Sequence, residues 1–117
     1  MIIKIKDKEI ELCYTMRMFI IYENITGENI DFNNMQSLKQ VTTLLLACII
    51  ASAQKAKKEL NLDYSEFMDW LDENGDYNLI NDFAIWLAKE IETKVSLLKK
   101  EEEQEDDFPK TRKKAKN

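Results

Sequence analysis

Apolar and polar residues alternate along the first twelve positions of the chain, a spacing typical of strands with one buried face. The apolar members of this pattern are Ile3, Ile5, Ile10 and Leu12. Because successive side chains of a strand point to opposite faces, we predict a β-hairpin with strands at about 2–6 and 9–13 and a turn at Asp7-Lys8. An isolated hairpin is marginally stable in water, so we expect it to pack on a helix.

From Thr15 onward the apolar spacing becomes helical. Thr15 is a suitable N-cap for a helix at about 16–25, and Gly27 is placed to end it in the left-handed conformation. The apolar residues of this segment surround the helix almost completely; they are Met16, Met18, Phe19, Ile20, Ile21, Tyr22 and Ile25. Such a helix is either central to the core or shared between the core and a partner, and we expect it to be central.

Three further helices are predicted at about 38–58, 64–73 and 79–100. Ser37 caps the first, whose apolar stripe includes Leu38, Val41, Leu45, Cys48 and Ile49. Asp63 with Glu66 three residues later has the spacing of a capping box and starts the second, and Asn74-Gly75-Asp76 forms the turn after it. The last helix has a stripe of helical period at Ile80, Phe83, Leu87, Ile91 and Val95 or Leu98.

Charge runs replace this apolar pattern after Lys100. An acidic block at Glu101–Asp107 precedes a basic block at Lys110–Lys116, and neither block can build a core. We predict one mainly helical α+β domain at 1–100, with an N-terminal hairpin on a bundle of about four helices, and a disordered tail at 101–117.

Composition excludes several function classes. The 117 residues include no histidine and only two glycines, which argues against proton-transfer catalysis and phosphate-binding loops. The net charge of −5 argues against a dedicated nucleic-acid binder. No apolar run approaches the roughly 20 residues that span a bilayer, and no secretory signal is visible. Cys13 and Cys48 lie in apolar runs, so we expect core thiols in a cytoplasmic protein.

The sequence predicts no catalytic, cofactor or metal site. The carboxylates best placed for a metal are Asp72, Glu73, Asp76 and Asp82. Their spacing departs from that of a calcium loop, and no glutamate closes it. A helix end followed by a turn is the better interpretation.

Large aromatic and thioether side chains are the candidates for contact with a partner protein. We select Met18 and Tyr22 in the first helix, and Trp70 and Trp86 in the third and fourth. Flexible methionines suit adaptable surfaces, and tryptophan is enriched at interface hot spots. Core packing is the competing interpretation for all four.

The segment Tyr14–Gly27 reads Tyr-Thr-Met-Arg-Met-Phe-Ile-Ile-Tyr-Glu-Asn-Ile-Thr-Gly and follows the charged hairpin. It resembles the opening of the tail assembly chaperones of long-tailed bacteriophages and prophages. In that family a short hairpin leads to a helix that ends in an aromatic-Glu-x-x-Thr-Gly motif, here Tyr22, Glu23, Thr26 and Gly27. The order of the later helices is also similar, over about residues 1–100.

This resemblance implies a non-catalytic chaperone of the host cytoplasm. It would keep the long, helical tape measure protein in solution and help to recruit tail tube subunits, and a homo-oligomer is left open. Two other classes compete with this expectation. One is a nucleic-acid-linked regulator that uses the basic tail, and the other is a structural component of the virion.

Overall fold

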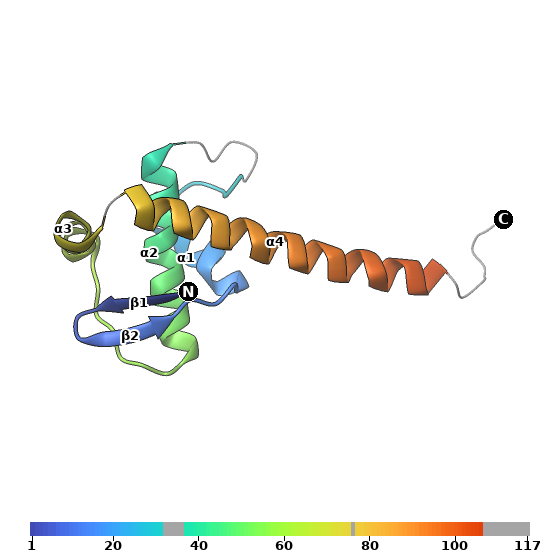
Figure 1. Ribbon diagram of the computed structural model, residues 1–117, viewed down its shortest axis with the longest axis horizontal. Coiled ribbons are helices and arrows are strands. Elements are labelled where there is room, and N and C mark those ends of the chain that lie inside the picture. Colours follow the sequence, from blue (N-terminus) through green and yellow to red (C-terminus); the bar gives the residue numbers. More distant parts are fainter. Residues whose placement is uncertain (32–36, 76, 107–117) are drawn as a thin grey trace. The chain divides into compact units, whose positions relative to one another are not determined.

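The computed structural model describes residues 1–31, 37–75 and 77–106, and the side chains of the last helix as far as Lys94. Its elements follow the order β1 (Ile2–Ile5), β2 (Lys8–Glu11), α1 (Met16–Thr26), α2 (Leu38–Lys55), α3 (Tyr64–Asn74) and α4 (Tyr77–Asp106) (Figure 1). The fold is α+β and mainly helical, as predicted. Residues 1–86 form one compact unit, and the described part of the second unit, 87–106, is the remainder of α4.

The hairpin is antiparallel, with Ile3 opposite Ile10 and Ile5 opposite Lys8. Its two-residue turn is Lys6-Asp7, one position earlier than the sequence predicts. Both turn residues have positive φ, 52° and 63°. Such a turn matches the twist of paired strands, so it fixes this register although neither residue is glycine.

One face of the hairpin is buried, as the alternation predicts, and β2 packs on α2. The buried side chains of this face are Ile3, Ile5, Ile10 and Leu12. Leu12 extends the pairing beyond β2, since its backbone N–H donates to the carbonyl of Met1 at 2.8 Å.

The central helix of the core is α2, along which α1 packs. Its side chains are buried almost without interruption from Thr43 to Ala53. In contrast, α1 buries Met18, Phe19 and Tyr22 and exposes Met16 and Ile20. The expectation that α1 is central is therefore only half met, because one of its faces stays open.

The end of α2 lies three residues before the predicted boundary. The helix ends at Lys55, and Lys57 adopts a φ of 59°. The backbone N–H of Lys58 donates to the carbonyl of Ala53 at 2.9 Å, and that of Lys57 donates to Gln54 at 3.1 Å. This is the bonding pattern of a Schellman motif with lysine at the position that usually holds glycine.

The last helix differs most from its predicted bounds. It begins at Tyr77 and continues to Asp106, so residues 101–106, expected in the disordered tail, are helical. Phe83 is fully buried, and Leu87 is also buried. The basic block Lys110–Lys116, the connector residues 32–36 and Asp76 lie outside the described residues.

Candidate protein-binding groove

Two of the four side chains selected from the sequence lie in the core. Met18 is 0% exposed and Tyr22 is 2% exposed, so neither offers surface to a partner in this conformation. Burial, together with the negative charge of Glu28, raises the pKa of the Tyr22 phenol. Core packing, the competing interpretation, describes these two residues.

Trp70 and Trp86 are half-buried and serve local packing. The indole N–H of Trp70 donates to the carbonyl of Lys4 at 3.0 Å, and its ring stacks on Phe67 with centroids 6.2 Å apart. Trp86 stacks on Phe83 at 5.9 Å. The hydrogen bond of Trp70 to Lys4 therefore links α3 to the hairpin.

The Glu-x-x-Thr-Gly motif organises the end of α1. The hydroxyl of Thr26 donates to the carbonyl of Tyr22 at 2.9 Å and accepts the N–H of Glu28 at 3.1 Å. The carboxylate of Glu23 accepts the N–H of Ile30 at 3.2 Å, and Gly27 adopts a φ of 72°. These residues fix the path of the chain after the helix, so the motif has a structural role here.

An apolar groove of about 420 Å³ lies between the first turn of α2, one face of α3 and the start of α4. We call it the α2–α3–α4 groove. Its lining residues are Leu38, Lys39, Thr42, Tyr64, Met68, Leu71, Asp72, Gly75, Tyr77 and Ile80. All of them belong to the compact unit 1–86.

Four large apolar side chains of this groove are exposed to solvent. Tyr77 is 81% exposed, Leu38 53%, Tyr64 42% and Met68 37%. Single exposed apolar residues are common on proteins, but several around one hollow are typical of a surface that contacts another polypeptide. The groove is therefore the strongest candidate for a binding site among the described residues.

Helix caps place these side chains. The hydroxyl of Ser37 accepts the N–H of Gln40 at 3.1 Å, which starts α2 at Leu38. The carboxylate of Asp63 accepts the N–H of Glu66 at 2.8 Å, which starts α3 at Tyr64. Residues separated by three and four positions share one face of a helix, so Met68 and Leu71 line the groove beside Tyr64.

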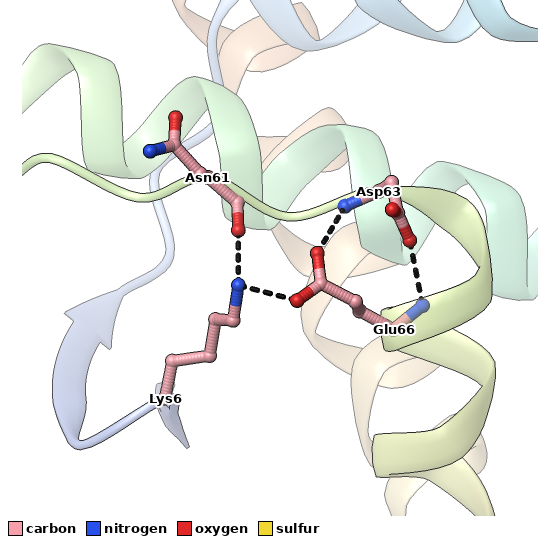
Figure 2. Close-up of polar contacts among 4 residues, drawn as sticks. All are labelled: Lys6, Asn61, Asp63 and Glu66. Carbon is pink, nitrogen blue, oxygen red and sulfur yellow. Dashed lines mark hydrogen bonds and ion pairs between the residues drawn. The ribbon is translucent and has the colours of Figure 1, made fainter.

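The orientation of α3 is further held by the hairpin. Figure 2 shows Lys6 of the hairpin turn between the backbone carbonyl of Asn61 and the side chain of Glu66. The ammonium of Lys6 lies 2.6 Å from a carboxylate oxygen of Glu66. The other oxygen of Glu66 accepts the N–H of Asp63 at 3.1 Å. Together these contacts keep the pKa of Glu66 below its usual range.

The sequence contained a signal for this groove that our interpretation did not use. In the helix at 64–74, Phe67 and Trp70 mark the side that packs inward, and Leu71 borders it. Tyr64 and Met68, four residues apart, mark a second apolar face of the same helix. A helix with two apolar faces cannot bury both of them against a single neighbouring element. Leu38 was assigned to the core stripe of α2, although the structure exposes it.

Among the described residues, the titratable groups whose pKa is shifted are Tyr14, Tyr22, Cys48 and Glu66. No group of three or more cysteine or carboxylate side chains is placed to hold a metal within the part of the chain that the structure describes. Burial raises the pKa of the Cys48 thiol to about 12, and its Sγ lies 3.6 Å from the carbonyl of Cys13. Among the described helices, none combines the length and the apolar character that crossing a membrane requires.

A second hollow lies beside the exposed face of α1. It is lined by Thr15, Arg17, Ile20 and Lys55, and Met16 is exposed nearby in sequence. Only one of its four lining residues is a large apolar side chain. The α2–α3–α4 groove is therefore better suited to apolar contact, and the α1 face provides a comparison surface.

Comparison of the chain with protein-family models, with curated proteins and with solved structures gives no match.

Proposed function

We propose that this protein is a non-catalytic tail assembly chaperone of a long-tailed bacteriophage or prophage. Its client is the tape measure protein, which it keeps in solution while tail tube subunits are recruited. The resemblance of residues 14–27 and of the order of elements suggests this family. The observation that carries the proposal is the α2–α3–α4 groove, where Leu38, Tyr64, Met68 and Tyr77 remain exposed.

The groove gives the chaperone a physical mechanism. A long helical client with an apolar stripe aggregates because its copies bury that stripe against each other. A segment of the client that lies in the groove removes apolar surface from water and cannot join such a contact. Each large side chain that becomes fully buried contributes about 1.5–3 kcal/mol, so a few anchors are sufficient for a reversible complex.

The test is co-expression with the tape measure protein of the same phage or prophage. We expect the client to be recovered in the soluble fraction and to co-purify with this protein. An unrelated acidic protein of similar size is the control, because net charge alone can improve solubility. Equal precipitation of the client with this chain and with the control would contradict the proposal.

Purified phage particles give a second test. A chaperone acts before the tail is complete, so this chain should be absent from mature particles. Its presence there at a fixed ratio to the tube protein would favour a structural virion component instead.

A further inference from the structure

The walls of the α2–α3–α4 groove favour a helical occupant over an extended one. The walls are helices, in whose interior the backbone groups bond within the helix, and the first turns of α2 and α3 are capped by Ser37 and Asp63. An extended peptide would therefore leave its own N–H and C=O groups without partners along the groove, whereas a helix satisfies them internally.

The length of the groove sets the length of that helix. The wall that α3 forms is 11 residues long, which corresponds to about 16 Å at 1.5 Å per residue, and its lining residues run from Tyr64 to Asp72. Such a wall accommodates about three helical turns. An occupant would therefore present apolar anchors spaced by three and four residues, as Tyr64, Met68 and Leu71 do on the wall itself.

The charge of α3 is the second observation. The helix and its cap hold five carboxylates and no basic residue; they are Asp63, Glu66, Asp69, Asp72 and Glu73. Glu66 is paired with Lys6, and Asp63 caps the helix. Asp72 lines the groove and has no ion pair with any side chain that the structure describes.

Two of these carboxylates occupy an unfavourable position. Asp72 and Glu73 lie in the last turn of α3, which contains no basic residue. The C-terminal end of a helix carries partial negative charge, so acidic residues there reduce stability. Local stability does not explain them, and local rules are most often broken at functional sites.

We infer that the groove binds an amphipathic helix of the partner protein that carries lysine or arginine along the flank facing α3. This inference rests on the proposed function and specifies the chemistry of the client segment. Lys39 stands on the α2 wall, so the basic residues of the occupant lie on one flank only. A second copy of this chain is a poorer occupant, because the chain has a net charge of −5 and like charges repel.

Two synthetic helical peptides of about four turns test the inference. Both carry the same leucines at spacings of three and four residues, and one flank holds either lysines or glutamates. Binding is measured by fluorescence anisotropy at low and high salt. We expect the lysine peptide to bind at least about fivefold more tightly at low salt, with the preference shrinking at high salt. Equal affinities, or a preference for glutamate, would overturn the inference.

Variants assign the effect to the groove. Asp72→Lys should reduce the preference for the lysine peptide, yet raise the thermal midpoint because lysine suits a helix C-terminus. Glu11→Lys makes the same charge change on an exposed strand position outside the groove, and it should keep the preference. Tyr77→Ser should weaken both peptides equally. A preference that Asp72→Lys leaves unchanged would place the charge contact elsewhere and overturn the inference.

The outcomes separate this inference from the proposed function. If the client is kept in solution but the two peptides bind alike, only the charge of the occupant is wrong. If the lysine peptide binds as expected but the tape measure protein still precipitates, the proposed function fails. The groove then binds a basic amphipathic helix of a different partner protein. Sedimentation of the protein alone completes the test. A dimer in the parent protein that dissociates in Tyr77→Ser would place a second copy of the chain in the groove and would overturn the inference.

Discussion

Gly27 after α1 and Lys57 after α2 both adopt the left-handed backbone conformation, with φ values of 72° and 59°. A side chain in this conformation is strained unless the residue is glycine. A Cβ atom at Gly27 would have no other atom within 4 Å, so only the backbone opposes a side chain there. The two positions therefore allow opposite substitutions to be compared in the same backbone conformation.

We predict that Gly27→Ala lowers the free energy of unfolding by about 1 kcal/mol, and that Lys57→Gly raises it by about 0.5–1 kcal/mol. The gain in Lys57→Gly is smaller than the backbone strain energy that the substitution removes, because glycine also increases the conformational entropy of the unfolded chain. Urea unfolding measures both changes. A loss of stability in Lys57→Gly would show that the Schellman motif at the end of α2 is wrongly assigned.

The buried thiol of Cys48 predicts how the stability of the protein changes at alkaline pH. Its pKa in the folded protein is about 12, above the ordinary value of 9.0. The unfolded chain thus loses this proton first, and stability that is fully present below pH 9 is lost as the pH rises toward 12. The slope contributed by one such group reaches about 1.4 kcal/mol per pH unit.

The measurement compares the unfolding free energy of the wild-type protein with that of Cys48→Ala from about pH 8 to about pH 11. The variant should lose stability less steeply above pH 9, the ordinary value. The raised pKa of Tyr22 acts in both proteins and cancels in the difference. Parallel curves would mean that the thiol of Cys48 reaches solvent.

At the scale of elements, the hairpin and α3 depend on each other through the contact of Lys6 with Glu66. The pKa of Glu66 is lowered, first by its bond with Lys6 and then by its bond with the N–H of Asp63. Its stabilising contribution is therefore present above the ordinary value of 4.5 and is lost as the pH falls through the lower folded value.

Glu66→Gln isolates this contribution, because glutamine keeps the capping box while it removes the charge. We predict that the wild-type protein loses more stability than the variant as the pH falls below 4.5. The effect is small and decreases with salt, since both side chains are partly exposed. Glu11→Gln, at an exposed strand position without an ion pair among the described residues, should follow the wild-type curve. Acid unfolding monitored by circular dichroism distinguishes the two variants.

Most elements could be predicted from the sequence because their signals are local. The caps Thr15, Ser37 and Asp63 and the end at Gly27 mark helix boundaries by side-chain chemistry that needs no tertiary contact. The end of α2 could not be found in this way. Lys57 adopts a left-handed conformation that lysine rarely takes, and neither glycine nor asparagine stands at this position to predict it.

The candidate site was harder to predict than the fold. Met18 and Tyr22 were selected for residue type, but type does not show which face of a helix neighbouring elements cover. Leu38 and Tyr77 lie at the first positions of α2 and α4, where the apolar stripe of a helix begins before its neighbours reach it. Their exposure follows from how α2, α3 and α4 meet, which periodicity along one helix does not encode.

At the scale of the whole molecule, the chain combines acidic charge with an exposed apolar groove. The net charge of −5 limits self-association, while Leu38, Tyr64, Met68 and Tyr77 offer apolar contact to a partner. This combination suits a protein that must remain soluble while it binds a poorly soluble client. The proposed basic flank of the client helix would let the acidic charge that keeps the protein soluble also favour binding of the client.

The central claim, that this groove binds the client, is tested by two matched double variants. Leu38→Ser with Tyr77→Ser removes apolar anchors of the groove, and Met16→Ser with Ile20→Ser removes as many exposed apolar residues from the face of α1. All four side chains are more than half exposed, so both variants should fold like the parent.

The measurement is the fraction of tape measure protein that stays soluble and co-purifies when it is co-expressed with each variant. The groove variant should lose most of this fraction, and the α1 variant should retain it. Equal retention by both variants, or a loss confined to the α1 variant, would contradict the account.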